Sequence, residues 1–299
     1  MIATARLPVL QTTSARSQFF RRLVRSKIAL AASAVFLVVS LAAIFAPLIT
    51  PNDPASLALI RRLKAPGFVD AGGKEYWLGT DTIGRDVYSR LVYGARISLV
   101  VGLSAVLVSG TVGVLFGLIS GFFGGWADDL IMRLADIQLS FPTILLALAI
   151  LAVLGPGLEK LIIVLGLTGW VQYGRIVRGQ VLSVKQEEFV VAARATGQRE
   201  WQILFRHILP NIWSPVIVIA SFSVASNIVA EASLSFLGVG VPPQIPSWGV
   251  MLADGRQYIG IAEWLTVPAG VAISLTVLSI NILGDWLRDF LDPRLKNIM

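Results

Sequence analysis

The chain has 299 residues, of which 55% are hydrophobic and only 14% are charged. Soluble domains of average composition carry about 25% charged residues, so this composition excludes an ordinary soluble protein and indicates several membrane spans. The absence of cysteine and the presence of a single histidine, His207, exclude disulfides, thiolate metal sites and multi-histidine metal sites. The net charge of +7 comes from basic residues between the apolar runs, a pattern that fits membrane topology and no nucleic-acid partner.

Six apolar runs predict six membrane-spanning helices. The runs cover 28–50, 97–121, about 134–154, about 161–180, about 213–237 and about 266–287. As a helix, the first run is roughly 35 Å long and crosses a hydrocarbon layer of about 30 Å. A cleaved signal peptide is the alternative for this run, but it is too long and Pro-Asn-Asp-Pro follows it instead of a small-residue cleavage site. Pro142 is expected to kink the third span.

The basic residues predict the orientation of these spans. Six spans place both termini on one side of the membrane. The arm before residue 28 carries several basic residues and no acidic residue, and most of the other Lys and Arg residues then also fall on the same side. The outer segment 51–96 is also rich in Lys and Arg, but it is long and contains acids. The positive-inside rule therefore predicts that both termini are cytoplasmic.

The stretch 188–211 interrupts the apolar spans with two short helical patterns, and this topology makes it a cytoplasmic loop. Gly197 separates the two patterns, and Pro210 is expected to end the second one before the fifth span. Small side chains at the tip would fit a groove of another protein, and Arg194 could pair with an acid there. An amphipathic helix lying on the lipid surface is an equally weighted alternative. The candidate coupling residues are Phe189, Ala192, Ala193, Arg194, Gly197, Leu209 and Pro210.

This stretch resembles the cytoplasmic loop of bacterial ABC-transporter permeases of the binding-protein-dependent type. The family pattern is Glu-Ala-Ala, three residues, Gly, nine residues and Ile-x-Leu-Pro, which here reads Val191-Ala192-Ala193, Gly197 and His207-Ile208-Leu209-Pro210. Val191 replaces the acid and His207 replaces the isoleucine. The resemblance implies that the loop is a coupling helix that docks on an ATPase, with one expected polar contact missing at Val191.

Further motifs extend the resemblance to the dipeptide, oligopeptide and nickel permease subfamily. They are WLGTDTIGRDVYSRLVYGARISLVVG (77–102), GFFGGWADDLIMRLADIQLSFP (121–142), AEASLSFLGVGVPPQIPSWGVML (230–252) and NILGDWLRDFLDPRLK (281–296). The chain is most similar to the "C" subunit. The resemblance implies an all-α integral membrane protein with a type-1 ABC importer permease core and an extra N-terminal helix. Its expected regions are the arm, first span and outer loop (1–95), the permease core (96–288, with the coupling loop at about 185–212) and a cytoplasmic tail (289–299).

The expected function is that of a non-catalytic permease subunit of an importer in the bacterial inner membrane. The sequence has no G-x-x-x-x-G-K-[ST] nucleotide loop, so this chain is not the motor and is expected to bind no cofactor or metal. The resemblance implies a second homologous permease subunit, two ATPase subunits (or one heterodimer) that use ATP and Mg, and an extracytoplasmic substrate-binding protein. Dipeptides or oligopeptides are the expected substrates, with nickel chelates or opines as alternatives. An intramembrane enzyme and an autonomous channel are distant alternatives, since paired catalytic carboxylates, an H-E-x-x-H helix and abundant mid-membrane charges are missing.

Small residues recur every fourth position along the second span. They are Ser109, Gly113, Gly117, Gly121 and Gly125. Residues at this spacing lie near one face of a helix, and small side chains let a second helix approach closely. We expect this face to pack inside the subunit, with pairing to the second permease subunit as the less favoured alternative.

Glu231 lies within the fifth predicted span, where a lone carboxylate is costly unless it faces protein or water. Asn227 lies one turn earlier and could share a hydrogen bond with it. We interpret Asn227, Glu231 and Ser235 as candidate residues of the translocation pathway, and a polar tie between helices is the alternative. Asp136 is expected to pair with Arg133 or with a loop cation.

Overall fold

The computed structural model describes residues 15–291 and confirms an all-α membrane architecture, with one two-stranded hairpin in that range. The long helices are α2 (Lys27–Ile44), α4 (Val87–Phe123), α7 (Leu158–Val184), α11 (Trp213–Phe236) and α13 (Val267–Leu291). Shorter helices are α1 (Ala15–Arg25), α3 (Ala46–Ile49), α5 (Gly125–Leu139), α6 (Thr143–Leu154), α8 (Glu188–Ala195), α9 (Glu200–Ile203), α10 (Leu209–Asn211) and α12 (Trp248–Gly255). Single turns are η1 (Leu59–Arg61), η2 (Leu204–Ile208), η3 (Arg256–Tyr258) and η4 (Glu263–Leu265), and β1 (Phe68–Val69) pairs antiparallel with β2 (Glu75–Tyr76).

Four of these helices, α2, α4, α11 and α13, are long and apolar enough to cross a membrane. The bent pair α5–α6 makes a fifth if it counts as one span. The α7 helix has the length of a span, but Gln172, Arg175 and Arg178 lower its mean hydropathy, and it is not among these candidates. Length and composition therefore support four or five spans within residues 15–291, and the count of six stays a prediction.

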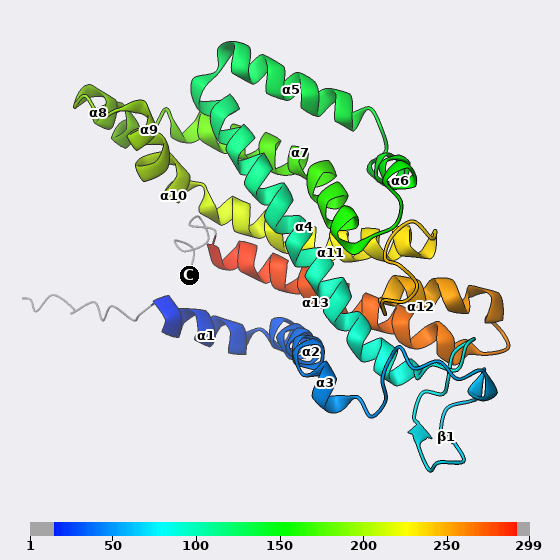
Figure 1. Cartoon of the computed structure of the whole chain (residues 1–299). Helices are drawn as coiled ribbons and strands as arrows, with labels where there is room; N and C mark the ends of the chain where they lie inside the picture. The colour runs from blue at the N-terminus through cyan, green and yellow to red at the C-terminus, as the bar shows by residue number, and fades with distance from the viewer. Residues whose placement is uncertain (1–14, 292–299) are drawn as a thin grey trace, which may run out of the picture.

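The third predicted span is not one kinked helix. The α5 and α6 helices meet at a bend of 87°. Pro142 directly precedes α6 and has no N–H for a bond to the preceding turn, so α5 ends at Leu139. The two helices leave in nearly perpendicular directions (Figure 1).

Two other predicted boundaries are wrong for local reasons. The α4 helix begins at Val87, well before residue 97, because the Asp86 carboxylate caps it by accepting from the backbone N–H groups of Tyr88 and Ser89. The α2 helix ends at Ile44, and the rest of the first apolar run forms α3 after a break at Phe45. The average hydrophobicity of a segment detects neither a polar residue that caps a helix before the apolar run nor a helix break inside that run.

The small residues of α4 pack against α7. A Cβ added to Gly113 would lie 2.4 Å from the Trp170 carbonyl oxygen, and one added to Gly117 would lie 2.7 Å from the Gly174 carbonyl oxygen. The corresponding distance from Gly121 to the Arg178 carbonyl is 2.9 Å, and a Cβ on Gly169 of α7 would lie 3.1 Å from that of Ser109. The two backbones are therefore in contact along most of the seam. Gly125 does not belong to it: this residue opens α5 and has open space around it.

Ion pairs join α5 to α7 beside this seam. Asp136 pairs with Arg175 of α7, and the expected pairing with Arg133 is wrong. Asp128 accepts from Arg178 Nε and Nη2, each at 2.6 Å. These contacts hold α5 alongside the end of α7 that leads into α8.

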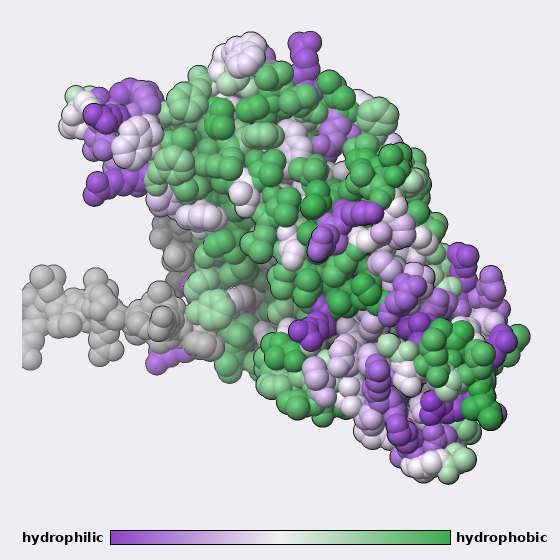
Figure 2. Space-filling view, viewed as in Figure 1, coloured by the Kyte–Doolittle hydropathy of each residue, from purple (hydrophilic) through white to green (hydrophobic). Residues whose placement is uncertain are grey.

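The polar parts of the molecule gather at two opposite ends. Helices α8–α10 lie at the same end as α1 and the last turns of α13, whereas the β1–β2 hairpin and α12 lie at the other end (Figure 1). The surface between the two ends is broadly apolar (Figure 2). An apolar belt between polar ends is the surface of a protein that crosses a bilayer.

Candidate functional site

Residues 188–211, here called the elbow segment, fold back onto the ends of α4 and α7. Gly197 has φ = +80° and forms the turn between α8 and α9, a backbone conformation that glycine adopts without strain. Val190, Ile203 and Ile208 are each 0% exposed and pack with apolar side chains of α4 and α7. The segment is thus anchored on the helix bundle through its buried side chains.

The outward side of the elbow segment exposes several apolar side chains among charged ones. Phe189 is 42% exposed, Val191 54% and Trp201 58%. Ala192 and Pro210 are also exposed, and Ala193 is buried with the anchoring residues. Exposed aromatic and aliphatic side chains on a rigid support are typical of a protein-binding surface.

Arg194 has a partner within the elbow segment. Its guanidinium lies 3.2 Å from the Glu200 carboxylate and 6.0 Å from the centre of the Phe122 ring. His207 Nε2 lies 2.8 Å from Gln198 Oε1, which links η2 to the turn at Gly197. Polar contacts within the segment thus fix the shape of the elbow.

Pro210 does not end the second helical pattern. It lies inside α10, which follows the π-helical turn η2, and the helix breaks only at Ile212 before α11 begins. In η2 the wider turn lets the Leu209 N–H reach the Leu204 carbonyl. The Asn211 side chain donates to the His207 carbonyl at 2.7 Å. Such π turns occur often at functional sites, and here the turn precedes α10, which leads through Ile212 into α11.

Two cavities lie along α4, α7 and α11. The first, here called the apolar cavity, has a volume of about 330 Å³, and its wall includes Val106, Leu118, Tyr173, Phe205, Leu209 and Trp213. The second, here called the polar cavity, has a volume of about 400 Å³, and its polar wall includes Thr168, Gln172, Tyr173, Ser223, Ser226 and Asn227. No Asp, Glu, Lys, Arg or His is found among the described residues that line the polar cavity.

The three candidate pathway residues do not share one environment. Asn227 lines the polar cavity, whereas Glu231 and Ser235, one and two turns further along α11, are buried. Glu231 accepts hydrogen bonds from Ser98 Oγ of α4 and from Ser235 Oγ, both at 2.9 Å, and does not bond to Asn227. Ser235 Oγ also accepts from the Val241 N–H at 3.1 Å. In this geometry the carboxyl group joins α11 to α4 and to the loop before α12.

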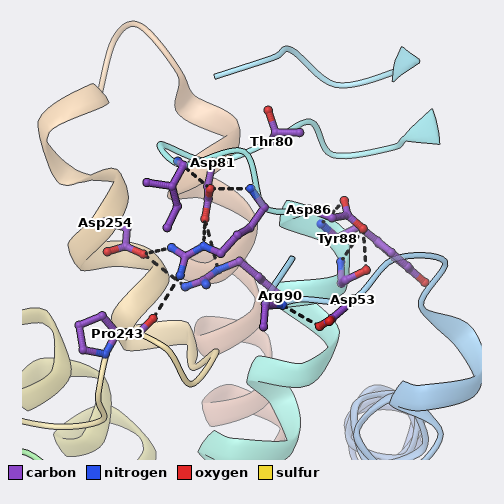
Figure 3. A network of polar contacts seen from close by, with 12 residues as sticks. Asp53, Thr80, Asp81, Asp86, Tyr88, Arg90, Pro243 and Asp254 are labelled. Carbon is purple, nitrogen blue, oxygen red and sulfur yellow. Dashed lines mark hydrogen bonds and ion pairs between the residues drawn. The ribbon is translucent and has the colours of Figure 1, made fainter. Parts of the chain in front are cut away.

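A second polar network fastens the hairpin end of the molecule (Figure 3). Arg85 bonds to Asp81 at 2.5 Å, to Asp254 of α12 at 2.8 Å and to the Pro243 carbonyl at 3.2 Å. Arg90 of α4 also reaches Asp254, at 3.3 Å. Burial raises the pKa of the Asp254 carboxyl, while Arg90 and Arg85 oppose that rise. The network ties the start of α4 to α12.

The sequence did not single out two residues of α7 that line the polar cavity. Gln172 and Tyr173 lie in the middle of α7, and both line the polar cavity. Two adjacent polar side chains inside the apolar run 161–180 were the available signal. Their shared surroundings depend on α11, which lies about fifty residues later in the chain.

Comparison with known proteins gives two matching families. The family described as "Binding-protein-dependent transport system inner membrane component" matches residues 113–297, and that described as "N-terminal TM domain of oligopeptide transport permease C" matches residues 14–66. The chain is 44% identical over 278 residues to the dipeptide transport system permease protein DppC of Alkalihalophilus pseudofirmus, a match that covers 93% of this chain and 90% of the relative.

Two further relatives are similar over almost their whole length. The di/tripeptide transport system permease protein DppC of Pseudomonas aeruginosa is 42% identical, and the glutathione transport system permease protein GsiD of Pectobacterium atrosepticum is 40% identical. Each match covers 99% of this chain and 97% of the relative. The chain therefore belongs to the inner membrane components of binding-protein-dependent transport systems, and it is a non-catalytic, multi-pass permease subunit.

Proposed function

We propose that this chain is one half of the membrane pathway of an ATP-driven ABC importer that brings dipeptides or oligopeptides into the bacterial cytoplasm. The names of these relatives refer to dipeptides, to di- and tripeptides, or to glutathione, and all of these are short peptides. The polar cavity has an uncharged wall, in which hydroxyl and amide groups stand among apolar side chains. Such groups complement the amides of a peptide backbone better than they complement a metal chelate or the extra carboxylates of an opine.

The single observation that carries the coupling role is the folded elbow segment with apolar side chains exposed on its outward side. Phe189, Val191 and Trp201 are exposed there, and Val190, Ile203 and Ile208 anchor the segment on α4 and α7. The segment leads through η2, α10 and Ile212 directly into α11, so a push on its outward side would reach that helix. The ATPase is therefore assigned to this side, with an apolar contact at Val191 in place of the acidic one.

The position of the elbow segment supports the following topology and partners. Both termini and the elbow segment face the cytoplasm. A second, homologous permease subunit completes the pathway, and two ATPase subunits bind and hydrolyse ATP with Mg. A substrate-binding protein delivers the peptide at the hairpin end. Closure of the ATPase dimer opens the pathway outward, and hydrolysis returns it to the inward-facing state.

Two substitutions at Gly197 test the coupling role in the reconstituted complex. Gly197→Val places a β-branched side chain at φ = +80°, a conformation that strongly disfavours it, and should abolish ATP-dependent uptake of a labelled dipeptide. Gly197→Asn is the matched control, because asparagine tolerates this conformation and a Cβ here meets open space. Both variants should insert in the membrane. Normal uptake by the valine variant would remove the support for the coupling role.

A further inference from the structure

The two cavities follow one another along the bundle, with Tyr173 between them. Along α11, the apolar cavity is lined from Trp213 to Ala220 and the polar cavity from Ser223 to Ala230. Along α7, the polar cavity is lined from Leu165 to Tyr173, and Tyr173 is the one described residue shared by both walls. The two helices run in opposite directions. On α11 the residues of the apolar cavity are nearer to the elbow segment than those of the polar cavity, and on α7 the shared residue Tyr173 is the polar-cavity residue nearest to it. The apolar cavity therefore lies on the elbow side of the polar one.

The polar cavity presents hydrogen-bonding groups that are not used inside the chain. Gln172, Ser226 and Asn227 line it and make no side-chain hydrogen bond to any described residue. By contrast, the buried polar groups of the same helix, Glu231 and Ser235, bond to each other and to their neighbours. Polar groups at membrane depth that have no partner within the chain must meet water, a solute or another subunit, so these three are available to a ligand in the cavity.

The elbow segment forms part of the apolar cavity. Phe205 lies in η2 and Leu209 in α10, and both line the cavity together with Trp213 at the start of α11. Any displacement of the elbow segment therefore changes the size and shape of the space beside Tyr173.

Tyr173 is the wall residue that stands between the two cavities. The residue is 1% exposed, and its ring lies beside Gly110 of α4, where an added Cβ would be 3.6 Å from the ring carbon Cε1. Its buried hydroxyl faces the hydroxyls of Ser109 and Ser223 but makes no hydrogen bond of good geometry with them. A rotation of the ring that gave this hydroxyl a better hydrogen bond would therefore be favourable.

We propose that Tyr173 is the internal gate of this half of the pathway: its ring separates the polar cavity from the apolar cavity on the elbow side, and it swings when the elbow segment moves. This inference rests on the proposed function for the direction of transport. Gln172 and Asn227 hold the amide groups of a solute above the ring. The apolar cavity, at about 330 Å³, provides the space that the displaced ring enters.

Cysteine accessibility tests the gate, because the chain has no cysteine of its own. Ser226→Cys marks the polar cavity and Thr111→Cys marks the apolar cavity. In the reconstituted complex, a membrane-impermeant maleimide is added at the elbow-side face, with and without a non-hydrolysable ATP analogue, and labelling is read on this chain. We expect Thr111→Cys to react at least about tenfold faster than Ser226→Cys in one of the two nucleotide states.

The gate residue is then removed in the same background. Tyr173→Ala should make the two labelling rates similar in both states. Val177→Ala is the control, because Val177 lies one turn further along α7, is 0% exposed and lines neither cavity. Equal rates with Tyr173 present in both states, or an unchanged ratio in Tyr173→Ala, would overturn the gate. The assay needs no substrate, so failure of peptide uptake by the unmodified complex would count against the proposed function alone.

A second pair of variants does not depend on removing a buried ring. Gly179→Ala, on α7 and outside both cavities, adds a Cβ in open space and should leave uptake unchanged. Gly110→Phe fills the apolar cavity beside Tyr173 and should lower the maximal uptake rate by about tenfold or more, with the subunits still assembled. Normal uptake by the phenylalanine variant would contradict a gate that needs this space.

Discussion

At the scale of single residues, the molecule separates polar groups that are internally satisfied from those that are free. Glu231 is 0% exposed, and its two oxygens accept from Ser98 and Ser235. Asn227 lies one turn away on the same helix and faces a cavity instead. Both residues drew attention in the sequence because each is a polar group in an apolar span. Whether each one is buried or lines a cavity depends on helices distant in sequence, since Ser98 is 133 residues away from Glu231.

The two environments predict different effects of substitution. Glu231→Ala leaves two buried hydroxyls without their acceptor and opens a cavity, so it should lower the free energy of unfolding by about 2–4 kcal/mol. Glu231→Gln keeps the shape and part of the bonding, and its loss should be smaller. Asn227→Leu should leave stability unchanged and impair uptake. Thermal unfolding of the purified complex measures the first two, and a melting temperature of Glu231→Ala equal to that of the unsubstituted protein would refute the tie between helices.

At the scale of elements, the close contact of α4 and α7 supports both cavities. The glycines of α4 bring its backbone against that of α7, and this contact sets where Tyr173 lies between the cavities. The spacing of small residues predicted a packing face, but the sequence did not indicate which helix packs on it. The bend of 87° between α5 and α6 could not be predicted from the sequence either. Pro142 predicts a break in the helix, but the angle follows from packing.

The same Gly-to-Ala change at two positions tests the seam. Gly113→Ala puts a methyl group within 2.4 Å of the Trp170 carbonyl oxygen and should lower stability by about 1–3 kcal/mol. Gly179→Ala, on α7, meets no atom within 4 Å and should be neutral or raise stability by up to about 1 kcal/mol, because alanine favours the helix. The melting temperatures of the two variants give the answer. Equal values would show that the helices do not depend on close backbone contact.

At the scale of the whole molecule, the sequence contained the main architecture and the family, because both depend on long runs and spaced motifs. Apolar runs predicted the positions of α2, α4, α11 and α13, although the ends of α2 and α4 were wrong. The elbow segment was also predicted, with its turn at Gly197. The stacked cavities and the role of Tyr173 were not, since a cavity is formed by residues from several helices and leaves no pattern in any one of them.

The account depends most on where the exposed face of the elbow segment lies and what covers it. Val191 is 54% exposed on that face, and the chain has no cysteine, so Val191→Cys provides a unique attachment point. In the assembled complex, a short bifunctional thiol reagent should link this cysteine to an ATPase subunit, and an impermeant maleimide should reach it only from the cytoplasmic side once the ATPase is removed. Labelling from the outer side, or the absence of any link to an ATPase while the complex still transports, would contradict the account.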